Sequence, residues 1–269
     1  EPSSLPPPVL FFGTVSGVFL MAVGVTWVRH RVVPAGRREP TGNTAAAYMT
    51  ALGSLFAILT GFLINAEYQS QRDAENLIST ETAAATRLAW STEGLPSADV
   101  SLVQDSLTEY LGTLEEYEWP AMVEGNPERS RAFEPLGRVQ SNVFNVASRP
   151  YATDASVEGM RSAIADMTSL RRERIASSQE LLPVGLLALA VLSGFALIAN
   201  AITVTLRSGR LDIFVAAGIA LIVALDLALI VGLGAPFQGP FQASVEPVER
   251  LHDEMAAGQY LPWIESSNQ

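Results

Sequence analysis

The 269-residue chain contains no cysteine, no lysine and only two histidines. Without cysteine there can be no disulfide and no thiolate site for a metal or for redox chemistry. All 17 basic residues are arginine, which we attribute to coding bias rather than to chemistry. The net charge of −11 argues against nucleic acid as a partner, because binding to phosphates requires positive charge.

Sequence motifs of enzymes are missing as well. The chain has no glycine-rich phosphate loop and no EF-hand spacing of acidic residues. Its Ser-Gly pairs, such as Ser193-Gly194, have no general base nearby in the sequence. We therefore expect a protein that is not an enzyme and that uses neither a cofactor nor a metal.

Apolar residues, by contrast, are abundant and clustered, and they make up 48% of the chain. Four windows of about 20 residues or more are long enough to cross a hydrocarbon core. They are Val9–Val28, Ala45–Ile64, Leu181–Leu206 and Leu211–Leu233. Because a backbone in lipid must satisfy its own hydrogen bonds, each window is expected to be a helix. The pattern predicts an all-α, polytopic membrane protein with four transmembrane helices.

The first window could instead be a signal peptide, which would have a basic flank before it. Here Glu1 to Ser4 carry no base, and Arg29 and Arg31 follow the window, so a retained helix is favoured. The expected organisation has four parts: transmembrane helices one and two in 1–65, an extramembrane helical insert in 66–182, helices three and four in 183–234, and a tail in 235–269.

The positions of the arginines also predict which parts of the chain lie on each side of the membrane. The loop after the first window contains Arg29, Arg31, Arg37 and Arg38, and the loop between the last two windows contains Arg207 and Arg210. Short arginine-rich loops stay in the cytoplasm. We therefore expect a bacterial plasma-membrane protein whose two termini and 66–182 insert lie on the external side. His30 and His252 would then lie on opposite sides and could not share a metal.

The insert itself has a helical pattern. Residues 66–95 continue helix two. They contain no proline and a single glycine, Gly94, and their apolar members recur at steps of three and four. Ser97 or Asp99 can cap a further helix that runs to about Glu118 and is broken by Trp119-Pro120. Two more helices are expected, roughly over 127–148 and from Thr153 or Asp154 to Leu182. Helices two and three should therefore both extend out of the membrane.

Helix two carries a stripe of small and polar residues on one face: Thr50, Ser54, Ala57, Gly61 and Asn65. Two interpretations are open. Small residues allow close packing of helices, and hydroxyl and amide groups can also line a pore or face the axis of an oligomer.

Several charged and polar groups allow two interpretations each. Glu67, Asp73 and Glu75 follow the stripe and form either a solvated helix face or, in a ring of subunits, external rings of carboxylates. Asp226, with Asn200 as a candidate partner, is either an ion or proton site or a buried hydrogen-bonding group, because an unpaired carboxylate in lipid is costly. Arg171, Arg172 and Arg174 either pair with acids of helix two, which we favour, or bind anionic lipid headgroups.

Three segments resemble the bacterial bestrophin-like membrane family, a four-helix domain of unknown function, and together they extend over nearly the whole chain. They are Gly61-Phe62-Leu63 leading to Glu81-Thr82-Ala83-Ala84, then Tyr117-Glu118-Trp119-Pro120, then Pro236-Phe237-Gln238-Gly239 with Ser244-Val245-Glu246-Pro247. Relatives often have an acid shortly before the Pro-Phe pair. Here Leu233-Gly234-Ala235 stands there, which puts an acidic role at that place in doubt.

The resemblance implies a ring-shaped ion channel, pentameric if it follows bestrophins, whose second helix lines the pore. It also implies a cytoplasmic soluble region, in contrast to the arginine pattern. We expect a homo-oligomer in the lipid bilayer with helix two near the axis and an acidic, cation-favouring exterior. The alternative is a non-conducting structural or accessory subunit that docks a cell-envelope partner or a larger membrane complex.

Overall fold

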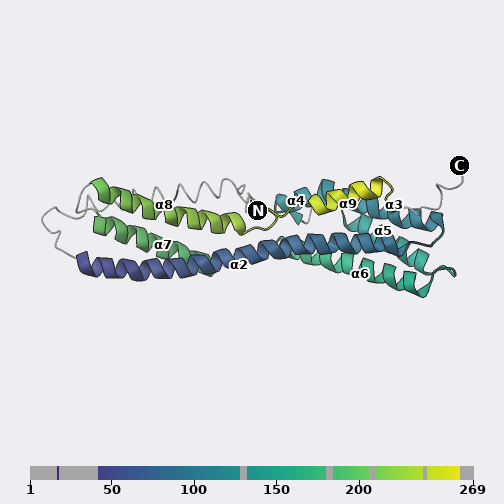
Figure 1. The fold of residues 1–269 in the computed structure, drawn as a ribbon, viewed down its shortest axis with the longest axis horizontal. Helices are drawn as coiled ribbons and strands as arrows, with labels where there is room; N and C mark the ends of the chain where they lie inside the picture. Colours follow the sequence, from purple (N-terminus) through teal and green to yellow (C-terminus); the bar gives the residue numbers. More distant parts are fainter. Residues whose placement is uncertain are drawn as a thin grey trace. The chain divides into compact units, whose positions relative to one another are not determined.

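A computed structural model of the chain describes Gly17 and residues 42–127, 132–179, 184–205, 210–238 and 241–260 (Figure 1). Regular structure in these ranges is helical throughout, which confirms the all-α prediction. Three of the helices contain segments long and apolar enough to cross a membrane: Ala47–Ser91, Gly185–Ile202 and Phe214–Leu233. The expected first span, Val9–Val28, lies outside the described residues apart from Gly17.

The chain divides into two compact units. We call residues 1–70, 181–235 and 239–241 the apolar unit, and residues 71–180, 236–238 and 242–269 the insert unit. Helix α2 (Gly42–Ser91) contributes to both, because its 50 residues continue from the second apolar window into the insert. Helix α2 is thus longer than its apolar window, and its extension out of the membrane stays a prediction.

The apolar unit consists of the first part of α2 with α7 (Val184–Thr205) and α8 (Arg210–Leu233). Helices α7 and α8 pack against each other, and one face of α2 joins them in a single core. That core includes Phe56 and Leu63 from α2, Ile198 from α7, and Val223 and Leu227 from α8. Each helix leaves its other faces exposed, as helices in lipid or in an oligomer do.

Gly194 sets how closely these helices approach. A Cβ atom at this position would lie 2.9 Å from Val223 Cγ1 and 3.0 Å from Phe56 Cε2. Gly194→Ala should therefore lower the free energy of unfolding by about 1–3 kcal/mol through overpacking. Gly218→Ala is the matched control, since a Cβ there meets nothing within 4 Å, and alanine favours a helix more than glycine does. Thermal denaturation in detergent micelles measures both, and equal midpoints would contradict the prediction.

The other helices of the insert unit pack against one side of the second part of α2. The unit contains α3 (Ser97–Thr113), the π-helical turn η2 (Leu114–Glu118), α4 (Trp119–Val123), α5 (Phe133–Ala147), α6 (Asp154–Ser177) and α9 (Glu246–Ala256). Helix α5 packs on α6, α3 on α5 and α9 on α3, so these helices follow one another in the order α6, α5, α3, α9. Their shared core includes Leu88, Leu107, Val139, Met160 and Leu251.

Two helices of this unit begin close to where they were predicted. Helix α3 begins at Ser97, but its N-cap is Pro96 and neither Ser97 nor Asp99 caps it. The turn before it contains Gly94 at a φ of +83°, a value that glycine adopts without strain. Helix α6 begins at Asp154, where the Thr153 hydroxyl accepts a hydrogen bond from the Ser156 N–H and so caps the first turn.

Three other boundaries were predicted wrongly, two of them because of proline. Helix α5 begins at Phe133 and not at residue 127, because Pro135 is tolerated only in the first turn of a helix. The chain does not break at Trp119-Pro120 but continues through η2 into α4, where Pro120 stands in the first turn. Helix α6 ends at Ser177 in a turn rather than reaching Leu182.

Candidate functional site

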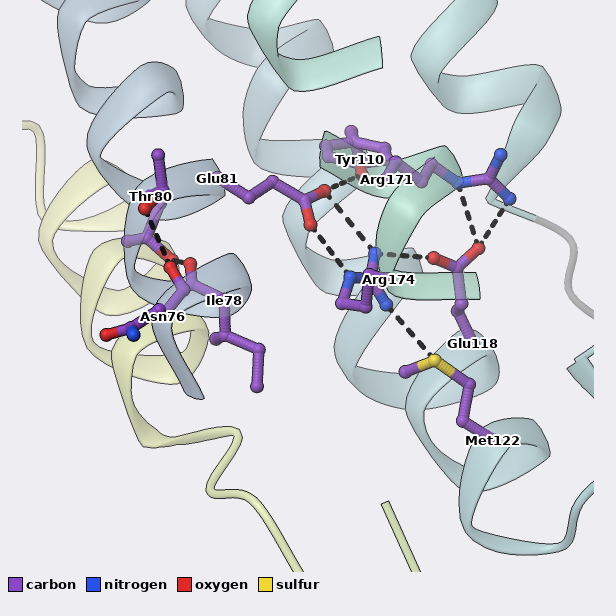
Figure 2. A network of polar contacts seen from close by, with 10 residues as sticks. Asn76, Ile78, Thr80, Glu81, Tyr110, Glu118, Met122, Arg171 and Arg174 are labelled. Carbon is purple, nitrogen blue, oxygen red and sulfur yellow. Dashed lines mark hydrogen bonds and ion pairs between the residues drawn. The ribbon is translucent and has the colours of Figure 1, made fainter. Parts of the chain in front are cut away.

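The most concentrated group of charged side chains is buried inside the insert unit (Figure 2). Glu81 comes from α2, Glu118 from η2, and Arg171 and Arg174 from α6, and Tyr110 of α3 lies beside them. All five side chains are buried, and Glu118 and Tyr110 are fully so, at 0% exposure. We call these five residues the buried polar network. It joins four helical elements that are distant in the sequence.

Arg174 is the centre of the network. Its Nε donates to Glu81 Oε2 at 2.8 Å, and its Nη2 donates to Glu118 Oε1 at 2.6 Å. Arg171 donates from Nε and Nη2 to the other Glu118 oxygen, Oε2, at 3.1 and 2.5 Å. The Tyr110 hydroxyl donates to Glu81 Oε1 at 2.5 Å. Both carboxylates thus have partners on both oxygens.

Charge balance explains how these groups tolerate burial. Two carboxylates face two guanidinium groups, so the network is neutral, and each ion is hydrogen-bonded, as a buried charge must be. Burial alone would lower the pKa of Arg174, but the adjacent Glu81 and Glu118 carboxylates raise that pKa above its ordinary value. Burial, together with the charge of Glu81, raises the pKa of the Tyr110 hydroxyl well above its usual 10, so the hydroxyl stays protonated and donates.

Local helix geometry places these side chains in the network. Arg171 and Arg174 are three residues apart on α6 and share a face, whereas Arg172 between them is exposed. In η2 the Trp119 N–H donates to the Leu114 carbonyl, five residues back, which makes a wider turn than an α-helix. This turn accommodates Pro120 and ends in the buried Glu118, so the proline and the acid of the motif have connected roles.

The contacts of the buried polar network indicate a structural role. Its acceptors are occupied by arginine and tyrosine donors, and the described ranges contain no cluster of His, Asp and Glu suited to a metal. The predicted pairing of the α6 arginines with acids of helix two is confirmed for Arg174, which binds Glu81. The roles of Tyr110 and of Glu118 as the second carboxylate were missed, because no local pattern links them to α6.

The second and third motif segments contact each other as well. Trp119 and Phe237 form an edge-to-face pair with ring centroids 5.7 Å apart, and both side chains are buried. The Pro236 carbonyl accepts from the Ala243 N–H at 2.8 Å, which folds the chain back before α9. Gly239, a further motif residue, lies outside the described residues. The Trp-Pro and Pro-Phe motifs therefore contact each other in the insert unit. Trp119 directly follows Glu118 of the buried polar network in the sequence.

The predicted stripe of α2 is exposed in the single chain. Thr50, Ser54, Ala57, Gly61 and Asn65 are all exposed, and at 3.6 residues per turn they share one face. The face that packs on α7 and α8 contains different residues, including Phe56 and Leu63. A third face exposes large apolar side chains, among them Ile58 at 71% and Phe62 at 61%.

The predicted acidic and intramembrane residues have different surroundings. Glu67 is buried, whereas Asp73 and Glu75 are exposed, and of the three only Glu75 continues the stripe, through Tyr68 and Arg72. In the apolar unit Asp226 of α8 and Asn200 of α7 are each half-buried. Ser193 of α7 is buried and donates to the Ala190 carbonyl at 2.9 Å.

Comparisons with known proteins agree with this architecture. The model of a bestrophin-like domain matches residues 16–248. A bacterial bestrophin homolog from Klebsiella pneumoniae has similar solved structures: a tryptophan-to-alanine variant is 11% identical, with a TM-score of 0.72 over 94% of this chain and 98% of that one. An isoleucine-to-threonine variant is 14% identical, with a TM-score of 0.66 over 91% and 99%. At these identities the likeness concerns the fold. No curated protein matches the chain.

Proposed function

Because the chain belongs to the bestrophin-like family, we propose that it forms a homo-oligomeric ion channel in the plasma membrane, with α2 nearest the axis. The proposed ring is a pentamer, by analogy with bestrophins. The channel is expected to be neither an enzyme nor dependent on a cofactor. The single observation that carries this proposal is the exposed stripe on α2.

The stripe favours an environment other than lipid. Ser54 and Asn65 expose a hydroxyl and an amide on a helix that is otherwise apolar enough to span a membrane. An amide without hydrogen-bond partners in hydrocarbon costs several kcal/mol. Water on an axis or polar groups of neighbouring subunits would satisfy it. The large apolar face with Ile58 and Phe62 is suited to lipid or to an adjacent helix.

The proposed ion preference is for cations. Asp73 and Glu75 are exposed on the part of α2 that follows its apolar window Ala45–Ile64, and the whole chain carries −11. Glu67, which is buried, would act within the subunit rather than at a pore mouth. An anionic vestibule raises the local concentration of cations. Asp226 remains a proposed ion or proton site, since a half-buried carboxylate in a span needs protein or water around it.

A bulky side chain on the stripe should block conduction. Ser54→Trp is expected to reduce ion flux into reconstituted liposomes to background, because five indole rings would fill an axis lined by this face. Leu55→Trp is the matched control on the same helix, since Leu55 is 44% exposed and lies about 100° around the helix from Ser54. Flux should persist in that variant.

The same assay distinguishes the channel from its alternative. If the native protein conducts no ion under varied voltage, pH and calcium, the non-conducting accessory role is favoured, in which the insert unit docks a cell-envelope partner or a larger complex. Equal flux from Ser54→Trp and Leu55→Trp would contradict the assignment of α2 to the axis.

Sidedness follows from the arginine-rich loops. A cysteine at Ser97, exposed at the start of α3, should react with a membrane-impermeant maleimide added to intact cells, whereas a cysteine at Ser208 should not. The chain has no native cysteine, so each label reports one site. The opposite pattern would place the insert unit in the cytoplasm, the orientation of bestrophins.

A further inference from the structure

A groove follows the seam between α5 and α6 on the surface of the insert unit. Two adjoining hollows of about 250 and 130 Å³ share Gln140, Thr168 and Arg172 in their linings. Phe144 and Ile164 line one of them, and Phe133 and Leu136 line the other. Leu136 and Ile164 also belong to the core of the insert unit, so the groove lies where the core reaches the surface between α5 and α6.

The groove combines exposed aromatic rings with positive charge. Phe133 is 72% exposed and Phe144 is 48% exposed, which is unusual for phenylalanine in a water-facing unit. Arg161 and Arg172 are exposed along its α6 side, and neither forms an ion pair with another described residue. No acid is among the residues that line either hollow. In a chain of net charge −11, this surface is suited to an acidic partner.

The length and charge of the groove are suited to a protein occupant. Both hollows are partly open to solvent, whereas small-molecule sites bury most of the surface of the ligand. Arg161 and Arg172 are eleven residues apart, which on a helix corresponds to about 16 Å. A short helix laid along the seam would span the two guanidinium groups, in the way that amphipathic helices occupy grooves.

Helix α9 has the complementary surface. Its apolar residues Val248, Leu251 and Met255 are buried against the insert core, and Glu249 and Asp253 are exposed on its outer face beside Arg250, which pairs with Glu246. The 11-residue helix is about 16 Å long, and its two acids lie about 6 Å apart, so the long arginine side chains would converge on them from either end. In the helix order α6, α5, α3, α9, the groove and α9 lie at opposite ends. A closed ring of identical subunits requires two different, complementary surfaces on each copy, which this arrangement supplies.

We propose that the α5–α6 groove binds the acidic outer face of α9 from a neighbouring copy of this chain, with Arg161 and Arg172 facing Glu249 and Asp253. This interface rests on the homo-oligomer proposed above and adds the surfaces by which the insert units meet. Phe133 and Phe144 would be covered by the neighbouring copy.

Photocross-linking tests the interface. A benzophenone amino acid placed at Phe144 in the full-length purified oligomer should give, on irradiation, an adduct of twice the 28.8 kDa chain mass, with the link in residues 246–256. The same probe at Tyr151, which is equally exposed at 49% but does not line the groove, should give no such link. An oligomer with no adduct, or with a link to another segment or another protein, overturns the proposal.

Charge exchange gives an independent readout. Reversing both groove arginines, with Arg161→Glu and Arg172→Glu, should abolish the adduct, and adding Glu249→Arg and Asp253→Arg should restore it. These side chains are exposed, so the variants should fold. Failure of the exchange to restore the adduct overturns the pairing. A conducting oligomer without the adduct overturns only this interface, whereas the adduct in a preparation without flux overturns only the channel.

Discussion

Replacing Arg174 with alanine is expected to lower the free energy of unfolding by about 3–5 kcal/mol, because it removes one partner of a buried ion pair and leaves carboxylates uncompensated. Glu81 loses its arginine partner and Glu118 retains only Arg171. Chemical denaturation of the full-length protein in micelles measures the change. The loss should exceed that of most single substitutions in this chain.

The control for this prediction is a surface pair in the same unit. Arg87 and Asp166 form an ion pair at 2.7 Å, but both side chains are about half exposed, at 59% and 45%. Arg87→Ala should therefore cost at most about 1 kcal/mol. In the Arg174→Met background, Glu81→Leu should cost less than it does in the native protein, because it then removes an unpaired carboxylate. Equal losses in the free energy of unfolding from Arg174→Ala and Arg87→Ala would show that the buried network stabilises the protein no more than a surface ion pair does.

Trp119→Ala is expected to cost about 3–5 kcal/mol, the usual range for truncation of a buried tryptophan. The indole is 7% exposed and forms the edge-to-face contact with Phe237, so the variant leaves a cavity between the η2–α4 segment and the 236–238 segment. The same denaturation experiment measures the loss. Because Trp119 adjoins Glu118, the buried polar network should also become less ordered.

Trp90→Ala provides the comparison. Trp90 also forms an edge-to-face pair, with Tyr260, but it is 49% exposed, so less apolar surface returns to water when it is truncated. The expected loss is well below that of Trp119→Ala. A Trp119→Phe variant should recover part of the stability, since a smaller ring still contacts Phe237. A loss from Trp119→Ala no larger than that from Trp90→Ala would argue that the motif contact is dispensable.

The family motifs acquire a physical explanation only in the folded chain. Glu118, Trp119 and Pro120 are consecutive in the sequence, yet each has a separate role: an ion-pair partner, a core aromatic and a first-turn proline. The arginines of α6 were predicted to pair with acids of helix two, and Arg174 does so with Glu81. Nothing local to residues 171–174 indicates that Glu118 is their second partner, because the contact joins segments 53 or more residues apart.

The sequence by itself determined the helical class, the apolar windows and the length of α2, because hydrophobic periodicity and the scarcity of helix breakers act locally. Proline explains the errors as well: Pro135 shifted the start of α5, and Pro120 was tolerated through a π turn that no periodicity predicts. Only the tertiary structure decided which polar residues are buried. The partners of Glu81, the contact of Trp119 with Phe237 and the groove between α5 and α6 all depend on packing between distant segments, which a single sequence does not encode in any local pattern.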